Sequence, residues 1–337
     1  SNNTAVGYHA LQVNTTGTEN VAVGSTALDA NTTASENTAV GYNSMGATTT
    51  GSNNAAFGFG SLRTNTTGAD NTALGKVALA ANTTASNNTA VGSSALAANT
   101  TGTNSTAVGY AAGTSNTTGS ITAIGKSALL LNTTGTSNTA VGDASLRNNT
   151  TANNNTAVGS AALTSNTTGA ENTAVGYGAL DANTSGDTNT AIGVDALGKN
   201  TTASNNVAIG RSALFSNTTG TQNTSIGRLT LTQSTTVSSN TAVGYAALRF
   251  NTTGDKSVAI GSDCLDANTT GADNTAVGAS ALGSNTTASN NTAVGRLALF
   301  ANTTGANNVA VGSLALDANV NAGQCVAVGY QALSANT

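Results

Sequence analysis

The stretch Asn-Thr-Ala-Val-Gly-Ser-Ser-Ala-Leu-Ala-Ala-Asn-Thr-Thr-Gly-Thr-Asn, residues 88–104, recurs with small changes along essentially the whole chain. The glycine of its Ala-Val-Gly step returns every 17 residues from Gly7 to Gly329, except for one step of 16 residues between Gly109 and Gly125, where a residue is missing near Ser120. The chain therefore consists of 20 copies of one unit. We number the positions of the unit from 1 (Asn88 in this copy) to 17 (Asn104).

The composition already excludes several classes of protein. Lys, Arg, Asp and Glu together make up 7% of the 337 residues, against about 25% in an ordinary soluble domain, which argues against a generic enzyme surface. The net charge of −4 and the scarcity of cations offer no basic field for nucleic acid. No apolar run is long enough to insert this segment into a membrane.

The length of the unit selects the fold. Seventeen residues are too few for a two-helix repeat, and the glycine, Asn and Thr of every unit are poor helix formers. Asn-Gly and Asp-Gly pairs never occur, so tight hairpins are not indicated. The sequence therefore predicts an all-β, single-chain parallel β-solenoid (a β-roll) of 20 coils, and residues 1–337 are expected to form one continuous repeat domain.

Alternation along the Thr-Ala-Val step assigns expected faces to its residues. Position 4 is always a large apolar residue, such as Phe57, Leu74 or Ile124, and we expect it to point inward, with the alanine of position 3 pointing outward. The nearly invariant Leu of position 9 is expected to form a second ridge of the core. Position 5 glycine is expected at a corner with positive φ, or at a close backbone approach; examples are Gly24, Gly41, Gly92, Gly142, Gly210 and Gly278.

The Asn-Thr-Thr of positions 12 to 14 is expected to stack from coil to coil in hydrogen-bonded ladders. Examples are Asn31, Thr32, Thr33, Asn99, Thr100, Thr101, Asn217, Thr218 and Thr219. The same tripeptide is an N-glycosylation sequon, and the ladder is the favoured explanation of its recurrence. Charged and aromatic residues occupy the variable positions 6, 7, 10, 11, 16 and 17, which are expected to face solvent.

No residue pattern points to catalysis, a metal or a cofactor. His9 is the only histidine and has no repeating partner. Cys264 and Cys325 lie about four coils apart, beyond the reach of a disulfide, and are expected to be unpaired. The carboxylates occur in some units and not in their neighbours, so no pair of coils supplies a calcium cage.

Six tyrosines share position 6 and form a broken row along one edge of the predicted solenoid. They are Tyr8, Tyr42, Tyr110, Tyr177, Tyr245 and Tyr330. Such a row can cover backbone, stack on sugars or pack against a neighbouring chain, so it is a candidate surface for contact.

The Asn-Thr-Ala-Val-Gly step followed by Ala-Leu resembles the head repeats of the YadA-like trimeric autotransporter adhesins, and similar arrays occur in phage tail fibres. The nearest local matches are Ser257–Gly261 and Asn206–Gly210. The resemblance implies a left-handed roll, a homotrimer, and a fibre at a cell surface or on a virion that touches a host or matrix.

We therefore expect a non-catalytic structural and adhesive extracellular fibre segment. Its expected partners are copies of itself, in a homotrimer or by head-to-tail or lateral packing, and host-cell glycans or matrix. Two alternatives stay open: an ice-binding solenoid with threonine arrays, and a phage tail fibre or tailspike that binds or processes host glycans. An enzyme would need clustered acids, and the irregular coils at 44–50, 112–120, 229–239 and 319–324 gather none.

Overall fold

The fold is seen in a computed structural model, which describes residues 2–336. The chain divides into two compact units, residues 1–170 and 171–337, and each is described by itself. Both are all-β, and every copy of the repeat contributes one short strand. The predicted parallel β-solenoid is confirmed in both units; that residues 1–337 form one continuous domain stays a prediction.

The strands coincide with positions 2 to 4 of the repeat. In the first unit they are β1 (Thr4–Val6), β2 (Val21–Val23), β3 (Thr38–Val40), β4 (Ala55–Phe57), β5 (Thr72–Leu74), β6 (Thr89–Val91), β7 (Thr106–Val108), β8 (Ile121–Ile124), β9 (Asn138–Val141) and β10 (Thr156–Val158). In the second they are β11 (Thr173–Val175), β12 (Thr190–Ile192), β13 (Val207–Ile209), β14 (Thr224–Ile226), β15 (Thr241–Val243), β16 (Val258–Ile260), β17 (Thr275–Val277), β18 (Thr292–Val294), β19 (Val309–Val311) and β20 (Val326–Val328).

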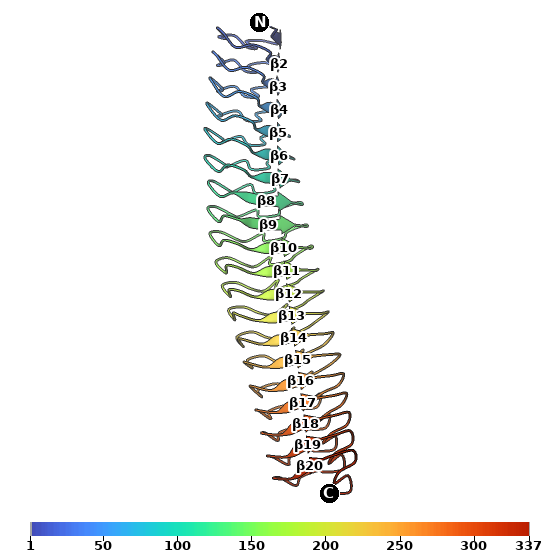
Figure 1. The fold of residues 1–337 in the computed structure, drawn as a ribbon. Helices are drawn as coiled ribbons and strands as arrows, with labels where there is room; N and C mark the ends of the chain where they lie inside the picture. Colours follow the sequence, from blue (N-terminus) through green and yellow to red (C-terminus); the bar gives the residue numbers. More distant parts are fainter. Residues whose placement is uncertain (1, 337) are drawn as a thin grey trace. The chain divides into compact units, whose positions relative to one another are not determined.

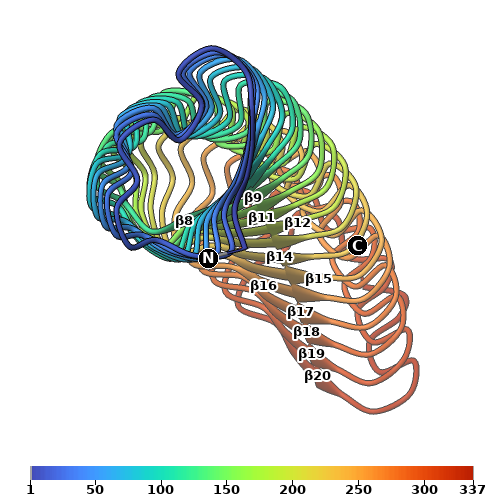
Figure 2. The same cartoon turned by 90° about the horizontal axis from the view of Figure 1, so that it is seen from above.

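Within each unit consecutive strands pair in parallel and in register. Thr38, Ala39 and Val40 of β3 lie beside the equivalent residues of β2 and β4, so like residues form files along the unit. Figure 1 shows the strands of each unit stacked on one side of the coils. The blue and green coils of the first unit follow one another as repeated closed outlines in Figure 2.

The rest of each coil turns through residues with positive φ. Besides the glycine of position 5, the residues at positions 7, 9 and 17 adopt the left-handed region, as Ser94 (φ 61°), Leu96 (φ 49°) and Asn104 (φ 58°) do in one coil. Such a residue costs about 1–3 kcal/mol unless its surroundings hold it. Here the backbone is bonded to the next coil, for example from Leu96 N to Ala112 O at 3.0 Å.

The core is built from the opposite strand face to the one expected. Position 3, which is alanine in every coil except for Ser225, is fully buried between the ends of the array, as at Ala39, whereas position 4 is half-exposed or exposed. The prediction that Phe57, Leu74 and Ile124 point inward was therefore wrong. Alternation fixes only which residues share a face; the narrow interior has room for alanine, the position 9 leucine and asparagine, and the branched side chains lie outside.

Two asparagines per coil brace this interior. In one coil Asn71 at position 1 and Asn82 at position 12 both donate through Nδ2 to the carbonyl oxygen of Ala85, at 2.9 and 3.0 Å. Asn82 also donates to Oδ1 of Asn65 in the preceding coil, at 2.9 Å. Because the amides are fully buried, these bonds prevent the desolvation cost of unpaired polar groups.

The short step of the repeat has a local structural account. The coil that follows β7 lacks one residue near Ser120, and its strand β8 begins at Ile121, which takes the place of the position 1 asparagine. The same coil carries Gly113 where other coils carry leucine. A Cβ on Gly113 would lie 2.9 Å from Cδ1 of Ile121, so the isoleucine fills the space left by the missing leucine.

Candidate functional site

The most extended candidate surface is the outward side of the strands. We define the outer strand face as positions 2 and 4 of β1–β20. Position 2 is Thr, Val or Ala, and position 4 is Val, Ile, Leu or Phe, so no charged residue lies on it. Position 4 side chains within the array, such as Val108 (37% exposed) and Ile260 (41%), remain open to solvent. An exposed apolar row on a repeating, in-register sheet is typical of an interaction surface.

The position 6 tyrosines lie on the surface at the C-terminal end of the strands. Each of the six expected tyrosines is between 45% and 72% exposed. Tyr42 stacks on Phe59 of the next coil, with ring centroids 5.3 Å apart and planes at 14°. Arg228 lies over the ring of Tyr245, 5.9 Å from its centroid. The row therefore presents aromatic faces and cations together, the combination that binds sugars or a protein partner.

The Asn-Thr-Thr segment divides between the interior and the surface. Asn31, Asn99 and Asn217 are buried and donate to the asparagine of the preceding coil, at 2.8, 3.1 and 3.0 Å. The first threonine of the segment donates through Oγ1 to a backbone carbonyl of the next coil, as Thr32, Thr100 and Thr218 do. The second, represented by Thr33, Thr101 and Thr219, is exposed.

The burial of these asparagines decides whether the Asn-Thr-Thr sequons can carry a glycan in the folded chain. A glycan needs the Nδ2 atom that the fold uses for the ladder, and the fully buried side chain leaves no space for a sugar. The same holds in the folded state for the other position 12 asparagines, which are all buried between the ends of the array. The folded chain therefore presents the exposed position 14 hydroxyls and not the amides.

The position 5 glycines combine both expected reasons for a glycine. Gly24, Gly41, Gly92, Gly142, Gly210 and Gly278 all have φ between +130° and +135°. At Gly41 an added Cβ would lie 2.5 Å from the carbonyl oxygen of Gly58 in the next coil. The glycine file therefore lets neighbouring backbones approach at the corner where the outer strand face meets the tyrosine row.

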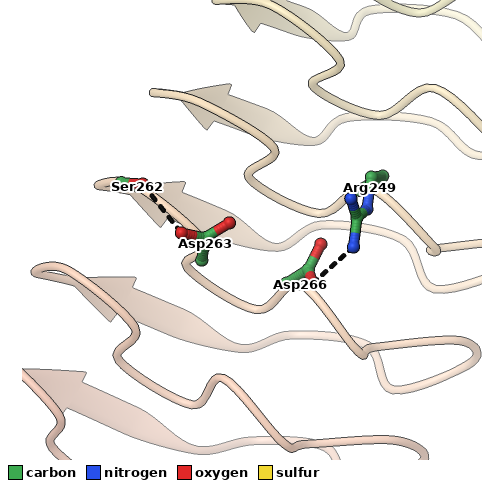
Figure 3. Close-up of polar contacts among 4 residues, drawn as sticks. All are labelled: Arg249, Ser262, Asp263 and Asp266. Carbon is green, nitrogen blue, oxygen red and sulfur yellow. Dashed lines mark hydrogen bonds and ion pairs between the residues drawn. The ribbon is translucent and has the colours of Figure 1, made fainter.

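An ion pair joins the coils of β15 and β16. Arg249 Nη2 bonds Asp266 Oδ2 at 3.0 Å, and Ser262 Oγ bonds Asp263 Oδ2 at 2.9 Å, as drawn in Figure 3. The Arg249 guanidinium also lies 4.2 Å from the ring of Phe250. Burial raises the pKa of Asp266, while Arg249 opposes the rise and Asp263 adds to it. In Figure 3 the two carboxylates turn toward different partners, so the geometry is that of a surface ion pair.

The remaining reactive side chains are isolated from one another. Cys264 is buried with its Sγ 3.2 Å from the carbonyl oxygen of Ala276, and burial raises the pKa of its thiol to about 12. Cys325 is partly exposed, and neither cysteine forms a disulfide. His9 packs edge-on against Tyr8. Across residues 2–336 there is no pocket and no group of three His, Cys, Asp or Glu side chains that could hold a metal ion.

Over the described part of the chain, no helix is long and apolar enough to cross a bilayer.

Two features of the structure were not predicted from the sequence. The position 1 asparagines form a second buried ladder, in which Oδ1 of Asn37 accepts from the backbone N of Asn54 at 2.9 Å; their recurrence in nearly every unit was the available signal. The sequence predicts that position 4 of the outer strand face points inward, because large apolar residues usually are buried. The absence of charges from positions 2 and 4 was the signal that these two positions share one distinctive face.

Comparison with known proteins does not assign the chain to a family. No family model matches it, and no curated protein matches it.

Proposed function

We propose that this chain is a non-catalytic segment of an extracellular fibre, on a cell surface, in a matrix or on a virion. In this proposal the outer strand face packs against copies of the chain, and the position 6 row contacts a host glycan or matrix component. The observation that carries the proposal is the outer strand face, which is uncharged at every coil and exposed along each unit. A repeated row of exposed apolar side chains at position 4, with uncharged neighbours at position 2, is a liability for a monomer and an interface for a fibre.

Self-association is tested by charging the outer strand face. Ile192→Lys with Ile226→Lys places two cations on exposed positions of that face. The matched control, Thr219→Lys with Thr253→Lys, places them on the exposed position 14 row. We expect sedimentation equilibrium to give an oligomer for the parent and the control, and a smaller species for the face variant. A monomeric parent would contradict the self-association.

Adhesion is tested on the position 6 row. Serine occupies this position in several coils, such as Ser93 and Ser262, so tyrosine-to-serine changes at Tyr42, Tyr110 and Tyr177 preserve the fold. We expect these changes to abolish binding to glycan arrays or matrix-coated surfaces. Unchanged binding would leave the chain a scaffold role alone.

One observation favours a second candidate function, ice binding. The outer strand face places a file of threonines at position 2 beside a file of valine or isoleucine at position 4, on one parallel, in-register face. The threonines of positions 13 and 14 lie outside the strands, which occupy positions 2 to 4. Measurable thermal hysteresis, lost when Thr89, Thr106 and Thr122 are changed to lysine, would support this function over the fibre.

A further inference from the structure

The outer strand face of residues 171–337 is bordered by two rows of opposite charge. Positions 16 and 17 lie before each strand, separated from it by position 1, and we call this row the acidic rim. Position 6 lies after each strand, separated from it by the position 5 glycine, and we call its charged row the basic rim. The acidic rim carries Glu171, Asp187, Asp255 and Asp273, with Lys256 as its one cation. The basic rim carries Arg211, Arg228 and Arg296 and no carboxylate.

The net charges of the two rims are equal in size and opposite in sign. Four carboxylates and one ammonium give the acidic rim a net charge of −3, and three guanidinium groups give the basic rim +3. Glu171 and Asp273 are exposed, as are all three arginines. Asp255 accepts a hydrogen bond from the backbone N of Ser238 at 2.7 Å, which holds its carboxylate at the rim.

Residues 1–170 show the same polarity. Glu19, Glu36 and Asp70 precede strands at position 17, and Lys76 and Lys126 follow strands at position 6. Asp143 is the one carboxylate of this unit at position 6. In both units, therefore, positions 16 and 17 carry a net negative charge and position 6 a net positive charge, with an uncharged face between them; Asp195 and Asp263 lie one residue beyond the basic rim, at position 7.

This arrangement distinguishes the two ways in which copies can meet face to face. If the coils of both copies stack in the same direction, turning one copy to face the other reverses its strand direction, and each acidic rim meets a basic rim. If the coils stack in opposite directions, the strand directions agree, and acidic meets acidic. Like charges brought together at a desolvated border oppose association, and opposite charges favour it.

We propose that copies of this chain associate through the outer strand face with their coils stacked in the same direction, and that the acidic and basic rims select this orientation. The inference rests on the proposed self-association and adds its polarity. It also predicts that the selection weakens as salt screens the rims, since the Debye length falls from ~10 Å at 0.1 M to ~3 Å at 1 M ionic strength.

The rims are tested by reversing them one at a time and together. Arg211→Glu, Arg228→Glu and Arg296→Glu make both rims acidic, and Glu171→Lys, Asp187→Lys and Asp273→Lys make both basic. At low salt we expect each triple variant to self-associate about tenfold or more weakly than the parent, and an equimolar mixture of the two to recover association. The six-fold variant, with both rims exchanged, should self-associate within about threefold of the parent.

The orientation itself is read from the native thiols. Cys325 is partly exposed, whereas Cys264 is buried, so a spin label on the folded protein modifies Cys325 alone. Equally directed copies bring the Cys325 labels of neighbouring chains together at the same level. We expect electron-electron resonance at low salt to report a short intermolecular distance in the parent oligomer.

The outcomes separate the two proposals. A monomeric parent overturns the self-association itself. An oligomeric parent whose association is unchanged by either triple variant, or whose Cys325 labels stay far apart, overturns the selection of polarity by the rims and leaves self-association standing. Weakening by single reversal, recovery in the six-fold variant and close labels together support the inference.

Discussion

At the scale of the residue, the glycines show how one missing methyl group permits the close stacking of coils. Gly58 and Gly60 lie two residues apart in the same coil, with φ of +137° and +61°. A Cβ on Gly58 would lie 2.5 Å from the carbonyl oxygen of Gly75, whereas a Cβ on Gly60 would meet nothing closer than 3.6 Å. Position 7, where Gly60 lies, already holds alanine elsewhere, as at Ala144 (φ 55°).

We therefore expect Gly58→Ala and Gly60→Ala to differ widely. Gly58→Ala should lower the free energy of unfolding by about 3 kcal/mol or more, because it adds backbone overlap to an unfavourable φ. Gly60→Ala should stay within about 1 kcal/mol of the parent. Urea unfolding followed by circular dichroism measures both. Equal effects would mean that the coils can separate to admit a methyl group.

The asparagine ladder is interrupted where residue 48 is threonine. Asn31 Oδ1 and Thr48 Oγ1 are both buried without a hydrogen-bond partner, because threonine lacks the amide that would donate to Asn31. Gly51 occupies position 15 of that coil and leaves room for the longer side chain. Thr48→Asn should raise the free energy of unfolding by about 1–3 kcal/mol.

A second interruption supplies the control for Thr48→Asn. Asn217 Oδ1 is also unpartnered, since Ser234 stands where an asparagine would donate. Here position 15 is the buried Val237, which fills the space beside the short serine. Ser234→Asn alone should destabilise, and adding Val237→Gly should recover the loss. If Thr48→Asn failed to stabilise, the ladder bonds would contribute no net stability.

Asp181 gives a residue-scale test by pH. Burial raises the pKa of Asp181, with Asp195 adding to the rise and backbone bonds opposing it. A carboxyl group whose folded pKa lies above its unfolded pKa costs stability when ionised, and the cost disappears as pH falls below the unfolded value of 3.8. Asp181→Asn should therefore stabilise at pH 7 and have no such advantage at about pH 3. Thermal unfolding at the two pH values measures this, and an equal effect at both would contradict the burial cost.

At the scale of the element, the short coil near Ser120 shows how a larger side chain at one position compensates for a missing side chain at another. Gly113 stands in the leucine position and Ile121 in the asparagine position, and their neighbours include Leu96. Gly113→Leu alone should destabilise by about 1–3 kcal/mol, because the added side chain overlaps Ile121. Ile121→Asn alone leaves a cavity. The double variant should lie above the sum of the two single effects in a double-mutant cycle, and strict additivity would show that the two side chains do not share one space.

For the strands, the sequence predicts the class of fold but not which strand face points inward. The 17-residue period and the poor helix propensity of Asn99-Thr100-Thr101-Gly102 were enough for the class of fold and the number of strands. Alternation at Thr89-Ala90-Val91 fixed which residues share a face and left the inward face undecided. That choice depends on the width of the coil, which follows from how Asn88 and Asn99 together bond one carbonyl, and a list of hydrophobic positions contains no such information.

The candidate surface was predictable only in part for a related reason. The tyrosine row follows from variable position 6 and lies on the surface. The outer strand face could not be predicted in the same way, because the apolar residues of position 4 were expected inside the coil and lie outside it. From sequence alone, a residue such as Ile192 is expected in the core. Its exposure follows only once the neighbouring Ala191 is known to point inward.

At the scale of the whole molecule, the repeat predicts how the fold tolerates deletion. Removing residues 76–92 takes out 17 residues and joins Gly75 to Ser93, so every file keeps its register: Asn99 can stack on Asn65, and the backbone of Ser105 can bond Oδ1 of Asn71. Removing residues 84–92 takes out nine residues and places unlike positions in the same file. Stability in such arrays is approximately a sum over repeats and their neighbours. We therefore expect the 17-residue deletion to keep the β-sheet spectrum with a melting temperature within a few degrees (about 5 °C) of the parent, and the nine-residue deletion to unfold the adjoining coils. Circular dichroism and limited proteolysis report both, and equal damage from the two deletions would mean that contacts beyond neighbouring coils hold the unit together.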